Sequence, residues 1–313
     1  MALNERLVLS PAGDRVFRSA AVLCALSVLV LLLLLVSTLA WKSLPAVRAF
    51  GAGFLWSNAW NPVTGAYGAL SSIYGTLVST LIALLLAVPL SLTIAFFLVE
   101  LAPPAVSRPV GVAIELLAAV PSIIYGMWGL FVFAPLMSRH LQPALARLSG
   151  GSPLFAGAQM GIGILTAGLI LALMILPFMT AVIRDVFSLV PPVVKEAAYG
   201  LGATKWEVAR QVTLRYGLRG VIGAGVLGLG RAIGETMAVT FVIGNEHRLS
   251  TSLFAPGNTI ASTLANEFSE ASDPLYVSSL VYLGAILLVI SIGIQWAAHS
   301  WLARVERRSG AWR

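Results

Sequence analysis

The feature that most constrains this chain is a series of apolar segments long enough to cross a lipid bilayer. A helix needs about 17–25 residues to span the hydrocarbon core, and six segments of the sequence reach that length. They lie near residues 19–41, 71–99, 111–137, 160–183, 217–243 and 275–302. The sequence therefore predicts an all-α, polytopic membrane protein with six transmembrane helices.

Composition supports this class and excludes some chemistry. Of the 313 residues, 58% are hydrophobic and 11% are charged, whereas soluble domains carry about 25% charged residues. Because Cys24 is the single cysteine, the chain can form no internal disulfide and no Cys-based metal site. The histidines are scattered singly, as His140, His247 and His299. We therefore expect no metal site, and lipid around most of the surface.

The net charge of +7 could indicate nucleic-acid binding, but membrane sidedness explains it better. Cytoplasmic loops of membrane proteins are enriched in Lys and Arg. With six spans, one side receives fourteen of these residues and the other side receives five. We therefore expect two cytoplasmic tails, 1–18 and 303–313, around a transmembrane domain over residues 19–302. Residues 42–70 and 244–274 are then external loops, and no nucleic-acid partner is expected.

The longest predicted cytoplasmic loop, about residues 184–216, contains a helix, a turn and a second helix. Pro191-Pro192 is a helix start signal. Glu196-Ala197-Ala198 leaves a surface of small side chains that another protein can approach closely. Gly202 permits a turn that a side chain would obstruct, and Leu214 belongs to an apolar ending. An ordinary helical hairpin between two spans is the alternative interpretation.

This pattern resembles the EAA loop of permeases from binding-protein-dependent ABC importers, with Gly202 at the family's spacing after Glu196-Ala197-Ala198. Arg215 stands where the family usually has proline. The resemblance implies a type I permease whose loop docks on an ATPase through Glu196, Ala197, Ala198, Gly202 and Leu214. The chain has no G-x-x-x-x-G-K-[ST] loop, so we expect ATP and Mg to bind a separate subunit.

The fifth predicted span carries two charged residues, Arg231 and Glu235. Residues four apart share one face of a helix, and charges inside a membrane face protein or water because lipid exposure is costly. One interpretation is a structural ion pair. The other is a path for an oxyanion, whose oxygens suit the planar donors of arginine. Glu115 either pairs with Arg231 or lies at the membrane interface.

The segment around these charges, from Gly230 to Val239 and including Thr236, resembles a signature of permeases from bacterial phosphate ABC importers. Further matches are Trp60-Asn61-Pro62 and the stretch from Glu115 to Gly129. The resemblance implies that the chain is a transport subunit and not an enzyme. It also implies a location in the bacterial inner membrane. The partners that it implies are a homologous permease, two ATPase copies and an external phosphate-binding protein.

Three other functions remain open from the sequence. A permease for sulfate, molybdate or another oxyanion would share most of these features. A proton-coupled secondary transporter could use Glu235 as its proton carrier, although it would need no ATPase-docking loop. A membrane scaffold could sense phosphate without moving it. Prolines within the predicted spans serve either bundle geometry or hinge motion; they are Pro89, Pro121, Pro135 and Pro177.

Overall fold

The computed structural model describes residues 11–308, and this part of the chain is helical with no strand. Two isolated backbone bridges, Asn61 with Ala66 and Gly244 with Gly257, are the extended pairings it contains. The predicted all-α class is therefore confirmed. Helices prevail because lipid offers the backbone no hydrogen-bond partners, so a spanning segment must satisfy its own N–H and C=O groups. Residues 1–10 and 309–313 of the predicted tails lie outside the described residues.

Within residues 11–308, four helices are long and apolar enough to cross a membrane by themselves. They contain the first, second, fourth and sixth predicted spans, and they are α1 (Pro11–Phe50), α3 (Leu70–Phe96), α8 (Ile164–Ser188) and α14 (Pro274–Arg308). Helix α3 continues into a π-helical turn, η1 (Phe97–Leu101). Pro89 and Pro177 lie inside α3 and α8, which nevertheless remain continuous helices.

The third and fifth predicted spans are bent pairs of helices, so the expectation of a single helix in each is wrong. Helix α4 (Pro104–Ala118) meets the segment Ser122–Leu148 at 92°. The break lies at Pro121, which has no N–H to continue the helical ladder and restricts the residue before it. The segment 205–233 meets α12 (Met237–Ile243) at 60°. The described part of the chain has six candidate spans only if each bent pair counts as one.

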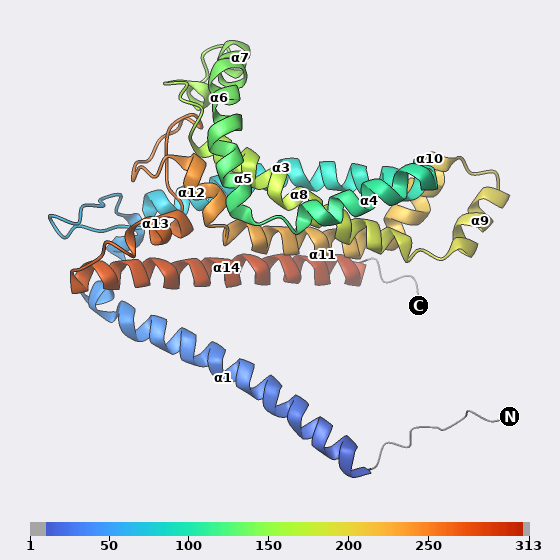
Figure 1. Ribbon diagram of the computed structural model, residues 1–313, viewed down its shortest axis with the longest axis horizontal. Coiled ribbons are helices and arrows are strands. Elements are labelled where there is room, and N and C mark those ends of the chain that lie inside the picture. The colour runs from blue at the N-terminus through green and yellow to red at the C-terminus, as the bar shows by residue number, and fades with distance from the viewer. Residues whose placement is uncertain (1–10, 309–313) are drawn as a thin grey trace.

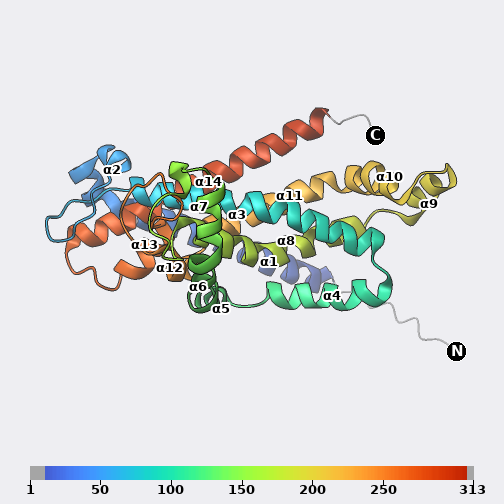
Figure 2. The same ribbon diagram turned by 90° about the horizontal axis from the view of Figure 1, so that it is seen from above.

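The bent segments are built from short pieces. Residues 122–148 comprise α5 (Ser122–Trp128), η2 (Gly129–Phe133), α6 (Ala134–Leu136), η3 (Met137–Leu141) and α7 (Gln142–Leu148). Residues 205–233 comprise α10 (Lys205–Glu207), η5 (Val208–Thr213) and α11 (Leu214–Ile233). The remaining elements are α2 (Gly53–Trp56), η4 (Pro153–Phe155), α9 (Pro192–Gly200) and α13 (Ile260–Glu267). Figure 2 shows α2 and α13 at one end of the bundle and α9 at the other. We call these the α13 end and the α9 end.

Helix α8 is the centre of the bundle. Its buried side chains include Ile170, Leu171 and Met174, which pack with residues of α3, α5 and α12. Close approach depends on small residues, as is common between membrane helices. A Cβ at Gly126 of α5 would lie 3.0 Å from the Ala238 Cα of α12. Both bent pairs therefore turn at the core of the molecule.

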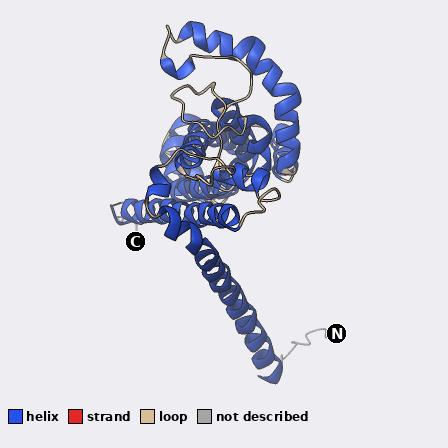
Figure 3. Ribbon diagram, turned by 90° about the vertical axis from the view of Figure 1, so that its left-hand side faces the viewer, coloured by secondary structure: helices blue, strands red, loops and turns tan. Residues whose placement is uncertain are grey.

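Helix α1 leaves the bundle (Figures 1 and 3), and no side chain in its most apolar window is buried. It is attached near the α13 end, where the Ser278 hydroxyl of α14 enters its hydrogen-bond ladder beside Pro45. Ala46 N donates to Ser278 Oγ at 2.9 Å, and Ser278 Oγ donates to Lys42 O at 3.0 Å. One serine thus satisfies a backbone donor and acceptor that would otherwise pair with each other.

Candidate functional site

The predicted helix–turn–helix in the 184–216 loop is confirmed. Helix α9 begins at Pro192, where proline suits the first turn because no backbone donor is needed there. The chain then turns at Gly202 with φ +88°, a left-handed conformation that favours glycine. Thr204 starts α10 with a capping box: its hydroxyl accepts from Glu207 N, and the Glu207 carboxylate accepts from Thr204 N.

The surface around α9 is exposed and partly apolar. No residue of α9 is buried, and Glu196 and Ala197 face outward while Ala198 is half-buried. A Cβ at Gly202 would meet no atom within 4 Å. Large exposed apolar side chains surround this helix, and they are Leu189, Val193, Leu201 and Trp206. Apolar groups gathered on a protruding helix are typical of a protein-binding surface.

Leu214 does not belong to this exposed surface. It opens α11, is half-buried, and packs against a cluster that contains Ile183, Phe187 and Ala224. The structure therefore separates the predicted coupling residues into two groups. Glu196, Ala197, Ala198 and Gly202 lie together at the tip of the α9 end, whereas Leu214 joins the loop to the bundle.

A buried carboxylate, Glu100, links the loop to the bundle, and our sequence reasoning missed it. Its Oε1 accepts from Lys195 Nζ at 2.7 Å and from Thr213 Oγ1 at 2.6 Å, and its side chain is 5% exposed. The signal was present, because a carboxylate at the end of an apolar span requires a cationic partner. The partner could not be identified, since Lys195 is 95 residues away in the sequence.

Arg231 and Glu235 do not share a helix face, so this prediction is wrong. Helix α11 ends at Ile233 with Gly234 as its cap, and α12 begins at Met237. Glycine is a poor helix former. The Glu235 carboxylate accepts from Ala238 N at 3.1 Å and so helps to start the next helix. These local preferences interrupt the helix between the two charges.

Arg231 also makes no ion pair with Glu235 in this chain, so the ion-pair interpretation is wrong here. The Arg231 side chain is exposed, and its guanidinium carbon lies 5.6 Å from the centre of the Phe178 ring. Glu235 and Thr236 are half-buried at the bend between α11 and α12. The three residues are therefore neighbours at a break in a spanning segment, where side chains and backbone groups are available to a ligand.

Glu115 pairs with Arg184 of α8 instead of Arg231. Glu115 Oε1 accepts from Arg184 Nη2, and its side chain is 55% exposed. Gly111 makes room for this pair, because a Cβ there would lie 2.4 Å from Arg184 Nη1. Glu115 thus ties α4 to α8 and is not joined to the Arg231 region by an ion pair in this structure.

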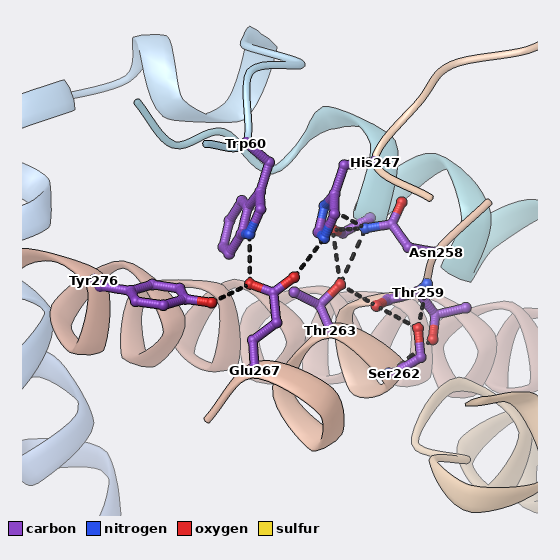
Figure 4. Close-up of polar contacts among 9 residues, drawn as sticks. Trp60, His247, Asn258, Thr259, Ser262, Thr263, Glu267 and Tyr276 are labelled. Atoms are coloured by element: carbon purple, nitrogen blue, oxygen red, sulfur yellow. Dashed lines mark hydrogen bonds and ion pairs between the residues drawn. The ribbon is translucent and has the colours of Figure 1, made fainter. Parts of the chain in front are cut away.

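A dense polar cluster lies at the α13 end, and Figure 4 shows its members pointing toward one another. We call it the Glu267 cluster: Trp60, His247, Asn258, Glu267 and Tyr276. Glu267 accepts from Trp60 Nε1, and from the Tyr276 hydroxyl at 2.7 Å. Its other oxygen contacts His247 Nε2 at 2.7 Å. The His247 ring stacks on Trp60 with centroids 4.8 Å apart.

The cluster joins segments far apart in the sequence. Asn258 Nδ2 reaches His247 Nδ1 at 3.0 Å, Ser72 Oγ of α3 at 2.6 Å and Thr263 Oγ1 of α13 at 3.0 Å. Burial alone raises the pKa of Glu267, but the hydrogen bonds from His247 and the other donors outweigh it. The pKa of this carboxyl therefore lies below its ordinary value of 4.5. The Glu267 cluster thus holds the two predicted external loops together.

Comparison with known proteins agrees with this geometry. A family model described as "Binding-protein-dependent transport system inner membrane component" matches residues 62–307. The phosphate transport system permease protein PstC of Mesorhizobium japonicum is 53% identical over 95% of this chain and 92% of its own length. PstC of Pasteurella multocida is 52% identical over 98% of this chain and 96% of its own length.

The fold also has a structural relative. A crystal structure of a bacterial ABC transporter involved in the import of the acidic polysaccharide alginate matches with a TM-score of 0.61. The match covers 93% of this chain and 97% of that chain at 15% identity, so it bears on the fold alone. With the family match and the apolar helices, these comparisons identify an integral inner-membrane transport component and not an enzyme. The chain belongs to the binding-protein-dependent transport family, whose members are the inner-membrane permease components of ABC importers.

Proposed function

We propose that this chain is the permease subunit through which an ATP-driven importer moves inorganic phosphate across the inner membrane. The observation that carries the proposal is the near full-length similarity to permeases named for phosphate transport. An oxyanion suits the chain's chemistry, because Arg231 offers a planar set of donors that match phosphate oxygens. A permease for sulfate or molybdate is the alternative within the same class.

The exposed face of α9 is the proposed ATPase-docking surface. Glu196, Ala197 and Ala198 lie on a helix with no buried residue, and Gly202 opens the turn behind them. The partners that fit this role are a PstA-like second permease, two PstB-like ATPase subunits that bind ATP and Mg, and a PstS-like external phosphate-binding protein. Closure of the ATPases on ATP would then move α9 and, through it, the spans.

The proposed substrate path passes the bend between α11 and α12. Arg231, Glu235 and Thr236 lie there, and the Arg231 side chain is exposed while the other two are half-buried. In this proposal the Glu235 carboxylate accepts a hydrogen bond from the O–H group of a protonated phosphate. Glu115 is held by Arg184 in this structure, so its role in the path begins only when that pair separates.

The path is tested by measuring phosphate uptake and, alongside it, the amount of assembled complex. We expect Arg231→Lys to assemble but to lose uptake, since lysine presents a point charge and not a planar fork. The double variant Arg231→Glu with Glu235→Arg should also stay inactive. Arg147→Lys, on α7, is the matched control and should transport normally. Full uptake by the double variant would remove Arg231 from the path.

The coupling surface is tested with Gly202→Asp, which adds bulk and charge to the docking turn. The complex should contain this chain but transport poorly, because the ATPase no longer seats on α9. Gly150→Asp is the matched control, since Gly150 also has a positive φ, of +61°, and open space around it. Equal uptake by both variants in vesicles would contradict the assignment.

The proposed orientation places both termini and residues 184–216 in the cytoplasm. After Cys24→Ser, single cysteines are introduced as Lys205→Cys and Ser250→Cys. An impermeant thiol reagent should label the first from the inside and the second from the outside. Labelling of both from outside would overturn this topology.

Reconstituted uptake separates the rival functions. Phosphate should enter vesicles only with ATP, the ATPase and the binding protein present, and excess sulfate or molybdate should not compete. Uptake driven by a proton gradient without ATP would indicate a secondary transporter instead. A complex that hydrolyses ATP and never moves phosphate would support the scaffold.

A further inference from the structure

We propose that Glu100 is a positioning residue that transmits the movement of α9 to the transmembrane helices. This inference rests on the proposed function, because it assigns the mechanical connection behind the ATPase-docking surface. Glu100 lies in η1, directly after α3. Its Oε1 accepts hydrogen bonds from Lys195 Nζ of α9 and from Thr213 Oγ1 of η5.

One carboxylate oxygen therefore joins three elements that are separate in the sequence. Lys195 directly precedes Glu196 on α9, so it moves with the docking surface. Thr213 is fully buried and is the last residue before α11. Helix α11 runs from this junction to the bend and carries Arg231 in its last turn. The contact thus lies between the docking helix and the helix that leads to the proposed substrate path.

Helix α9 also lies against η5, but its polar side-chain attachment to the bundle is through Glu100. None of its residues is buried, and the Lys195–Glu100 pair is the side-chain hydrogen bond or ion pair that it makes within residues 11–308. Its covalent connections run through the turn around Gly202 and through the segment before Pro192. If Glu100 lost its partners, α9 would keep these connections and its contact with η5, but it would lose its polar link to the end of α3.

The burial of Glu100 makes this contact stiff. Its side chain is 5% exposed and that of Lys195 is 19% exposed, so water competes little for either charge. Charged hydrogen bonds are stronger in such surroundings than at an open surface. A buried charge that loses its partner is strongly disfavoured. The pair therefore resists separation when an ATPase pushes or pulls α9.

The test uses the full complex in vesicles and measures phosphate moved per ATP hydrolysed. With Glu100→Gln we expect normal amounts of assembled complex and continued ATP hydrolysis, but a fall of about tenfold in phosphate per ATP. Lys195→Arg keeps the cation and should retain most of the coupling. Thr213→Val keeps the ion pair and should lose less coupling than Glu100→Gln.

A purely structural role predicts a different result. In that case Glu100→Gln would lower assembly, hydrolysis and uptake in proportion, and phosphate per ATP would not change. Because Glu100 and Lys195 act as one unit here, the double variant Glu100→Gln with Lys195→Gln should couple no worse than Glu100→Gln alone. If Glu100→Gln does not assemble, Lys195→Gln takes its place, and normal coupling by Lys195→Gln overturns the proposal.

Failure of this inference can be distinguished from failure of the proposed function. If Gly202→Asp uncouples the complex while Glu100→Gln transports normally, the docking surface stands and the Glu100 connection is wrong. If both variants transport normally, the docking assignment itself fails. If the unmodified complex moves no phosphate, the proposed substrate fails.

Discussion

Two buried carboxylates at opposite ends of the molecule show how differently those ends are built. At the α13 end, Glu267 accepts from Trp60 and Tyr276 and pairs with His247, and stacked aromatic rings enclose the group. At the α9 end, Glu100 accepts hydrogen bonds from Lys195 and Thr213, and α9 itself has no buried side chain.

The difference separates a cluster that joins distant segments of the chain from a carboxylate that lies behind an exposed helix. At the α13 end, Glu267 pairs with side chains from both predicted external loops and from α14, so these contacts hold distant parts of the chain together. The α9 end leaves large apolar side chains in solvent, among them Leu201 at 90% exposure and Trp206 at 68%. Substitutions at the α13 end should therefore change the stability of the chain. Substitutions at the tip of the α9 end should instead change assembly.

The largest effect is expected from Gly75→Ala in α3. A Cβ at this position would overlap the Asn258 carbonyl oxygen, a backbone atom that cannot turn away. Overpacking costs about 1–3 kcal/mol and occasionally more, and overlap with a rigid backbone atom places this variant at the upper end. Thermal unfolding of the purified chain in detergent should show the loss. Gly293→Ala in α14, where a Cβ meets nothing within 4 Å, is the control and should change little.

Glu267→Gln should have the next largest effect. Glutamine keeps the shape but removes the charge that three donors share, and hydrogen bonds to charged groups contribute about 1.5–3 kcal/mol. The free energy of unfolding should fall by that order. Glu270→Gln, three residues away and exposed, is the control. Equal stability of both variants would show that the Glu267 cluster does not hold the α13 end together.

Acid should weaken the same end. The pKa of Glu267 is lowered in the folded chain, so its contribution to stability is complete above its ordinary value of 4.5. That contribution is lost as the pH falls through the lower folded pKa, because protonation removes the shared charge. Unfolding midpoints measured across this range should drop for the unmodified chain. The drop should be smaller for Glu267→Gln, and an identical pH profile would contradict the assignment.

Leu201→Ser should have the smallest effect on stability. Leu201 is almost fully exposed, so the free energy of unfolding should change by less than about 0.5 kcal/mol. The amount of ATPase retained on the purified complex should nevertheless fall, since this side chain lies beside α9. Leu148→Ser, at 84% exposure on α7, is the matched control and should retain the ATPase.

The sequence predicts the parts of this molecule that depend on local properties. Apolar length located the segments later seen in α1, α3, α8 and α14. The need for a left-handed turn located Gly202. Hydropathy could not locate the bend at Gly234, because an average over a span does not register that a glycine and a capping carboxylate interrupt the helix.

The two carboxylate contacts could not be predicted, since they depend on distant segments. Glu267 lies 207 residues from Trp60, and Glu100 lies 113 residues from Thr213. Pattern reasoning placed residues 244–274 in an external loop and assigned no role to Glu267. The predicted common helix face of Arg231 and Glu235 failed for the opposite reason: spacing along the sequence suggested a proximity that the bend removes.

The attachment of α1 by Ser278 has a consequence for the membrane around the protein. At 40 residues, α1 is about 60 Å long, twice the hydrocarbon thickness of about 30 Å. It diverges from α14, so acyl chains or another subunit must fill the wedge between the two helices (Figure 1). Acyl chains are as apolar as leucine side chains, so replacing them releases no ordered water. A subunit that occupies this wedge must therefore be selected by its shape.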